Sequence, residues 1–190
     1  MLGCSKNEPP DAWLRLPLGS LLFTFLRRHL ECIEGFYGGA FDLKIVTPSH
    51  SSTRGGVSHL DALIGHIRGF SSEWASDILV KNDASKAGTR RGKIVPDLFT
   101  AKPVVEGKRV LLFDDTFTTG GSMASAAHAL KRSGATSVVG LAFGRQLNAE
   151  WRDSKDFVAS LCDRELELDK CVVHGGSQTD PFDLFFRQPG

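Results

Sequence analysis

Two adjacent acids, followed at once by small and hydroxylated residues, are the stretch of this sequence best suited to chemistry. Asp114 and Asp115 come directly after the apolar run 109–113. The residues after them that offer hydroxyls or an open backbone are Thr116, Thr118, Thr119, Gly120, Gly121 and Ser122. A helix beginning here would present free N–H groups and the positive end of its dipole. The pattern predicts a loop that holds one phosphate group, beside two solvent-facing acids that accept hydrogen bonds from sugar hydroxyls or face a metal ion.

Three other interpretations of this stretch are weaker. An ordinary strand-to-helix turn with an acidic cap would not need two acids followed by Thr-Thr-Gly-Gly-Ser. A P-loop is excluded because no Gly-Lys-Ser/Thr is present, and a dinucleotide-binding turn because there is no GxGxxG.

The run Val110–Met123 resembles the phosphoribosyl-diphosphate (PRPP) motif of the type I phosphoribosyltransferases. The resemblance implies that Asp114 and Asp115 bind the ribose 2′ and 3′ hydroxyls, support catalysis and face Mg²⁺. It implies that the loop binds the 5′-phosphate through residues 116, 118, 119, 120, 121 and 122. Thr118 stands where purine-salvage members of the family often carry Asp. A Thr at this position is more typical of the orotate-type and ComF-like branches.

The resemblance to the ComF-like branch continues upstream over Phe41–His50. That segment resembles the branch's first core strand and the loop that binds pyrophosphate, which implies this role for Thr47, Pro48, Ser49 and His50. The zinc-ribbon cysteines that many ComF-like proteins carry near the N-terminus are not seen, so we expect that module to be lacking or to lie upstream.

A basic segment follows residue 80 where the family has a loop that closes over PRPP. It contains Lys81, Lys86, Arg90 and Arg91. An ordinary solvated loop is the alternative, but a pyrophosphate leaving group needs cations to stabilise its charge. We therefore expect Lys81 to bind pyrophosphate and Arg90 and Arg91 to support catalysis.

The elements that must position these residues follow from periodicity. Expected helices cover 18–33, 57–67 and a stretch from near Gly121 that Gly134 ends; expected strands cover 42–46, 77–80, 109–113 and 137–143. Residues 114–122 are expected to be a turn-rich link, and residues 82–108 and those after 144 show little regularity. The predicted fold is α/β, a mainly parallel twisted sheet flanked by helices. The predicted layout is a poorly ordered lead-in (1–17), a phosphoribosyltransferase-like core (18–145) and a C-terminal appendage packed on it (146–190).

Composition narrows the function classes. The chain has 190 residues, 41% hydrophobic, with a formal net charge of +1. Near-neutral charge argues against a protein whose whole surface binds nucleic acid, but it leaves room for a local basic loop. No apolar stretch is long enough to span a membrane. We therefore expect a soluble, cytoplasmic protein with small-molecule partners; whether it forms a homodimer stays open.

Cysteines and histidines offer a second kind of site. Cys162, Cys171 and His174, with Cys4 as a further candidate, could bind zinc; the alternative is that the cysteines are buried apolar residues. The histidines on expected helices, which are His29, His59, His66 and His128, are expected at the surface or its boundary.

The resemblance implies an enzyme that transfers 5-phosphoribosyl from PRPP to an acceptor and releases pyrophosphate, with Mg²⁺ as cofactor. We expect the acceptor atom to be a nitrogen. A protein that binds PRPP or a nucleotide without catalysis, in a regulatory or competence-related role, is the alternative. A nucleic-acid partner in DNA uptake rests on the ComF-like analogy alone.

Overall fold

The computed structural model describes residues 14–48, 59–82, 92–147, 152–161, 170, 171, 173 and 174. The chain forms two compact units: residues 1–23 with 40–145, and residues 24–39 with 146–190. The predicted limits of the lead-in, core and appendage stay predictions. Within the described ranges, no helix is both long and apolar enough to cross a membrane.

The helices and strands follow one another in a largely alternating order. They are α1 (Arg15–Phe36), β1 (Leu43–Val46), α2 (His59–Gly65), β2 (Leu79–Lys81), β3 (Phe99–Ala101), β4 (Arg109–Phe117), α3 (Gly121–Arg132), β5 (Ser137–Arg145) and α4 (Arg152–Leu161). Short 3₁₀ turns lie at Ser71–Glu73 and Pro103–Val105.

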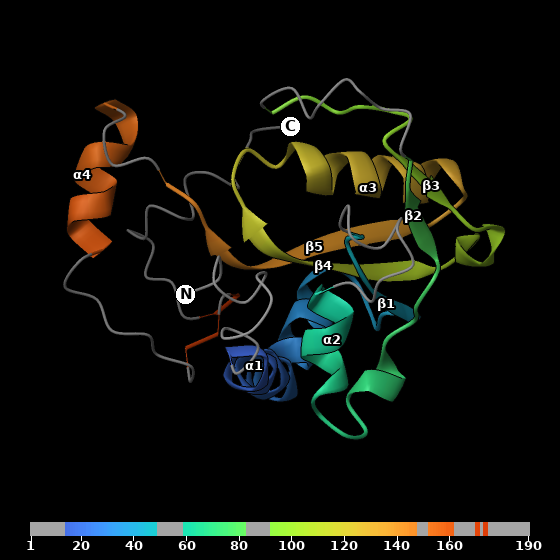
Figure 1. Ribbon diagram of the computed structural model, residues 1–190, viewed down its shortest axis with the longest axis horizontal. Helices are drawn as coiled ribbons and strands as arrows, with labels where there is room; N and C mark the ends of the chain where they lie inside the picture. Colours follow the sequence, from blue (N-terminus) through green and yellow to red (C-terminus); the bar gives the residue numbers. More distant parts are fainter. Residues whose placement is uncertain are drawn as a thin grey trace. The chain divides into compact units, whose positions relative to one another are not determined.

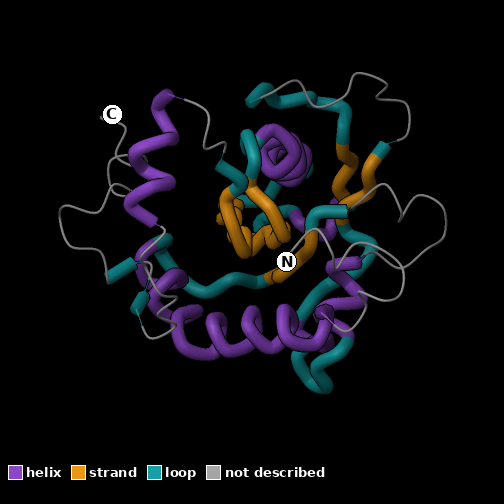
Figure 2. Tube along the Cα trace, turned by 60° about the vertical axis from the view of Figure 1, so that its left-hand side comes forward, coloured by secondary structure: helices purple, strands orange, loops and turns teal. Residues whose placement is uncertain are grey.

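A parallel sheet in the order β1-β4-β5 forms the centre of the first unit. Figure 1 shows α3 on one face of this sheet and α2 on the other, and Figure 2 shows the same layering from a second direction. The register places Val46 beside Phe113 and Asp114 beside Ala142. The three strands therefore end at a shared edge, where open α/β sheets bind ligands. This architecture confirms the predicted α/β fold class.

Strand β4 is buried on both faces, as its continuous apolar run predicted. On one face, Val110 and Leu112 pack in a cluster with Leu130 of α3. On the other, the Phe113 ring meets the rings of Trp74 and Phe143 edge to face, with centroids 5.8 and 5.1 Å apart. Burial on both sides fixes the position of residues 110–113, directly before the acidic pair.

The expected turn-rich link is largely strand. Strand β4 continues through Asp114 to Phe117, so only residues 118–120 separate it from α3. The pairing of Thr116 with Gly144 explains the difference, because β5 also extends, to Arg145, and gives β4 a hydrogen-bonding partner. Helix α4 was not predicted either.

An antiparallel ribbon of β2 and β3 was also missed, because β3 has only three residues. The ribbon buries Leu79, Phe99 and Ala101 in the same core cluster as α3.

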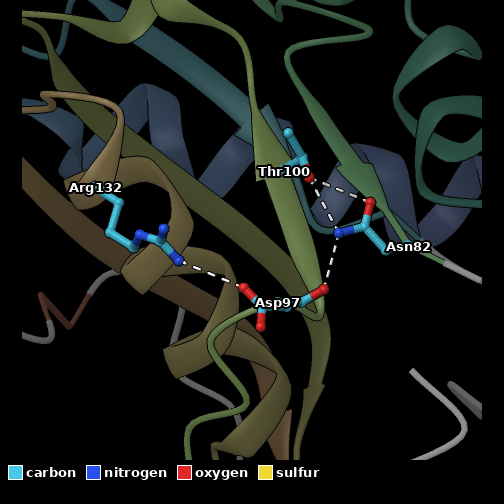
Figure 3. Close-up of polar contacts among 4 residues, drawn as sticks. All are labelled: Asn82, Asp97, Thr100 and Arg132. Atoms are coloured by element: carbon cyan, nitrogen blue, oxygen red, sulfur yellow. Dashed lines mark hydrogen bonds and ion pairs between the residues drawn. The ribbon is translucent and has the colours of Figure 1, made fainter. Parts of the chain in front are cut away.

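Polar contacts fix the ribbon where β2 ends and β3 begins (Figure 3). The Asn82 amide donates to the Asp97 carbonyl at 2.8 Å and to the Thr100 hydroxyl at 3.0 Å. Arg132 of α3 lies 3.5 Å from the Asp97 carboxylate. The two chain ends that flank the basic segment are therefore held together and lie close to α3.

Candidate functional site

The two acids of the motif lie on β4 itself and point to opposite faces, because successive side chains alternate along a strand. Asp115 lies on the face of Phe113 and is only 3% exposed, whereas Asp114 lies on the face of Leu112 and is half-buried. The backbone N–H of Asp115 donates to the Asp114 carboxylate at 2.9 Å. The expectation that both acids face solvent is therefore wrong for Asp115.

The buried acid has a partner that sequence reasoning missed. His59, the first residue of α2, places its Nε2 3.2 Å from Oδ2 of Asp115. Both side chains are largely buried, 13% and 5% exposed. The two residues are 56 positions apart and share no sequence pattern, so only the packing of α2 against the sheet reveals the pair.

The other helical histidines are simpler. His66 is exposed and contacts the Ala62 carbonyl. His29 is 4% exposed and its ring lies tilted beside that of Phe25, with centroids 5.1 Å apart, so the expectation of a surface or boundary position is wrong for it. Neither belongs to the sheet edge that carries the acids.

Lys81 is the last residue of β2. Of the basic residues predicted to bind pyrophosphate or support catalysis, it is the one that lies within the described residues. Burial lowers the pKa of its ammonium group, and the negative charge of Asp114 opposes that shift. The Lys81 Nζ also lies 5.9 Å from the centre of the Phe99 ring. The positive charge of Lys81 is therefore attracted by the carboxylate of Asp114.

The predicted phosphate loop is a tight turn at the N-terminus of α3. Helix α3 begins at Gly121, as predicted, and Gly120 caps it with a φ of +74°, a conformation that favours glycine. A Cβ at residue 120 would lie 2.6 Å from the Phe117 ring, so a larger residue would also force that ring to shift. Thr118 and Thr119 are exposed, which leaves their side of the turn open to an anion.

Thr47, the residue directly after β1, supplies a hydroxyl to the same edge. The Thr47 N–H donates to the Phe113 carbonyl at 2.8 Å, which places Thr47 beside the start of the acidic pair. Thr47 is 5% exposed, and its Oγ1 has no hydrogen-bond partner among the described residues. Pro48 lines a pocket of about 120 Å³ with Asp61 and Asp77. Ser49 and His50 lie outside the described residues.

Arg90 and Arg91 also lie outside the described residues, but the chain returns from them beside the phosphate loop. A Cβ on Gly92 would lie 3.8 Å from the Thr119 carbonyl oxygen. Further on, the Val95 N–H donates to the hydroxyl of Ser125, in the first turns of α3. The basic segment is thus attached next to the predicted site for the 5′-phosphate.

Comparison with known families agrees with this arrangement. The model of the phosphoribosyl transferase domain family matches residues 53–166, more than half of the chain. The match covers both acids, the phosphate loop and His59, whereas Thr47 and Pro48 precede it. No curated protein matches the chain.

Proposed function

We propose, because the chain belongs to the phosphoribosyl transferase domain family, that it transfers 5-phosphoribosyl from PRPP to a nitrogen acceptor and releases pyrophosphate. The observation that carries this proposal is that β4 ends in two acids and leads through three residues into the N-terminus of α3. One short segment thus offers acceptors for ribose hydroxyls next to a helix end that favours an anion.

In this proposal the turn before α3 binds the 5′-phosphate. Backbone N–H groups at the start of the helix and the hydroxyls of Thr116, Thr118, Thr119 and Ser122 donate to the phosphate oxygens. Gly120 and Gly121 keep that approach open. The Asp114 and Asp115 carboxylates accept hydrogen bonds from the ribose hydroxyls, and His59 orients Asp115 for this contact.

The pyrophosphate end is assigned to residues 47–50 and to the basic residues Lys81, Arg90 and Arg91. The Thr47 hydroxyl supports this, because a buried hydroxyl without a hydrogen-bond partner is costly unless a ligand satisfies it. Lys81 supports it because its ammonium group is close enough to interact with the Asp114 charge, and so lies near the acidic pair. These cations stabilise the charge that gathers on the pyrophosphate as it leaves.

The donors at this edge fit Mg²⁺, since carboxylate and hydroxyl oxygens are the ligands that this ion prefers. Asp114 is the better candidate to face the ion, directly or through water, because Asp115 is buried against His59. When bound, Mg²⁺ would add positive charge beside the pyrophosphate.

In the proposed reaction the bond between C1′ of the ribose and the pyrophosphate oxygen breaks, and its electron pair leaves with pyrophosphate. The acceptor nitrogen gives its lone pair to C1′ and loses a proton to solvent. Asp114 and Asp115 stabilise the positive charge on the ribose ring. The phosphate loop holds the far end of the sugar so that the reacting atoms stay aligned. Thr118, in place of an acid, favours the ComF-like branch over purine salvage.

The experiment is to measure pyrophosphate release by the full chain with PRPP, Mg²⁺ and a panel of bases and small amines. We expect release with at least one acceptor and none from the Asp114→Asn variant. If PRPP binds in calorimetry but no acceptor leads to release, the alternative of a PRPP-binding regulatory protein replaces the enzyme. Thr118 is the residue that favours this alternative, because it removes a side chain that could act on a purine.

A further inference from the structure

A group of soft ligands lies in the second unit, away from the family's motif in the sequence. The sulfurs of Cys32 and Cys171 and a ring nitrogen of His174 all lie within 4.8 Å of one another. Cys32 belongs to the C-terminal half of α1, and Cys171 and His174 follow α4. Both cysteines are free thiols, half-buried, and His174 is exposed. All three residues lie outside the range that the family model matches.

We propose that Cys32, Cys171 and His174 bind a divalent zinc-class cation. Two thiolates and an imidazole form a donor set that selects zinc over magnesium or calcium. With bonds of about 2.3 Å to sulfur and about 2.0 Å to nitrogen, tetrahedral ligand atoms stand roughly 3.5–3.8 Å apart. The observed group needs only a small contraction to reach that spacing. Three protein ligands leave the fourth position to water or an outside ligand.

The local backbone already suits a metal-bound sulfur. Residues 171 and 174 have the short Cys-x-x-His spacing, and residues 173 and 174 lie in a turn. The Val173 N–H donates to the Cys171 sulfur at 3.4 Å, a contact that favours a thiolate and orients it. The turn therefore presents a sulfur and a ring nitrogen together, toward Cys32.

This site adds a residue that the sequence interpretation did not include. Cys171 and His174 were candidates for zinc, but the third ligand that the structure brings to them is Cys32. Cys4 and Cys162, the other predicted candidates, lie outside the described residues. The bound cation would tie the segment after α4 to α1, so its role is to stabilise the second unit, apart from the proposed transfer reaction.

The test uses the full chain with Cys4→Ser and Cys162→Ser, in which Cys32 and Cys171 are the remaining cysteines. After reduction and removal of metal, this chain is titrated with Co²⁺ and then Zn²⁺. We expect one equivalent of Co²⁺ with sulfur-to-metal charge transfer and the intense visible bands of tetrahedral cobalt, then displacement by Zn²⁺. Zinc should also raise the melting temperature.

Variants in the same background assign the ligands. Cys32→Ser, Cys171→Ser and His174→Ala should each weaken Zn²⁺ binding at least tenfold, whereas His128→Ala on α3 should not. Circular dichroism of each metal-free variant shows whether it is folded. Either of two results would overturn the proposal: a reduced background chain that takes up no cobalt or zinc, or affinity that is unchanged when Cys32 is replaced. Non-reducing mass spectrometry that finds a Cys32–Cys171 disulfide, together with no metal uptake after reduction, would assign the pair to that bond instead.

Discussion

His59 Nε2 lies 3.2 Å from Asp115 Oδ2, and this contact joins the first residue of α2 to the buried acid of β4. It makes the position of the acid depend on a helix that lies outside the PRPP motif. Residues of this motif are therefore held by a part of the chain that the motif itself does not contain.

Replacing His59 by Ala should weaken both the fold and PRPP binding. The Asp115 carboxylate would lose a partner in a largely buried place, at a cost of about 1–3 kcal/mol. Urea unfolding measures the stability, and calorimetry measures the affinity for PRPP. His59→Gln, which keeps a donor, should recover part of the stability and of the PRPP affinity. His66→Ala, at the exposed residue directly after α2, should change neither. Unchanged unfolding and affinity in His59→Ala would show that the contact has no role.

The two acids should respond differently to amide substitution. Asp114→Asn should abolish PRPP binding with little change in melting temperature, because the residue is half-buried and its amide oxygen can still accept from the Asp115 N–H. Asp115→Asn should lower both the PRPP affinity and the melting temperature, because the Asp115 carboxylate is buried against His59. Parallel calorimetry and thermal unfolding separate the two cases. Full PRPP affinity in Asp114→Asn would remove this acid from the site.

Gly120→Ala should remove anion binding at the start of α3. The new Cβ would meet the Phe117 ring and would also oppose the φ of +74°, so the turn must move, at a cost of about 1 kcal/mol or more. A crystal of the wild-type protein grown with sulfate should show the anion at this turn, and the variant should not. Gly65→Ala is the control, since a Cβ there meets nothing within 4 Å. An anion bound equally well by the Gly120 variant would place the phosphate site elsewhere.

Asp61 should make the stability depend on pH. Burial, and then the nearby charge of Asp77, raise the pKa of its carboxyl above the ordinary value of 3.8, while His59 partly opposes them. A carboxyl with a raised pKa contributes most to stability below its unfolded pKa, and that contribution is lost as pH rises through its folded pKa. Asp61→Asn should therefore be more stable than the wild type at neutral pH, and the difference should shrink in acid. Urea unfolding from pH 3.5 to 7.5 measures it, and a constant difference would contradict the assignment.

The basic segment should matter for ligand binding more than for the fold. Arg90→Ala with Arg91→Ala should slow turnover or weaken PRPP binding while the melting temperature stays nearly constant. Arg27→Ala with Arg28→Ala on α1 provides a matched loss of two adjacent charges and should leave kinetics unchanged. Trypsin should cut the free protein between Lys81 and Lys93, and PRPP with Mg²⁺ should slow that cleavage. Equal cleavage with and without ligand would argue that the segment does not close over the site.

The sequence alone could predict the features that depend on neighbouring residues, but not those that depend on residues far apart in the chain. The central strand and the helix after it were predicted because each has a long apolar pattern of its own. Strand β3 was missed because three residues carry no period, and its pairing with β2 depends on a distant partner. The extension of β4 through the acids was missed for the same reason, since it needs β5 beside it.

The same contrast, between neighbouring and distant residues, holds for the candidate site and the proposed metal site. The motif acids and glycines were found from adjacent residues, whereas His59 and Cys32 reach their partners only through tertiary packing. No spacing rule in a single sequence links residues so far apart. The roles of the predicted site residues stay predictions until the variants above are measured.

The extension of β4 through Asp114 and Asp115 has an energetic consequence for binding. Asp114 and Thr116, on either side of Asp115, pair with Ala142 and Gly144 of β5, and this pairing already restricts the φ and ψ angles of the acids before any ligand arrives. A sugar that meets these carboxylates therefore costs little conformational entropy at the acids, whereas acids on a loop would lose roughly 1–2 kcal/mol per residue when ordered. Weakening the end of β5, for example with Gly144→Pro, should therefore lower PRPP affinity without touching a single group that contacts the ligand.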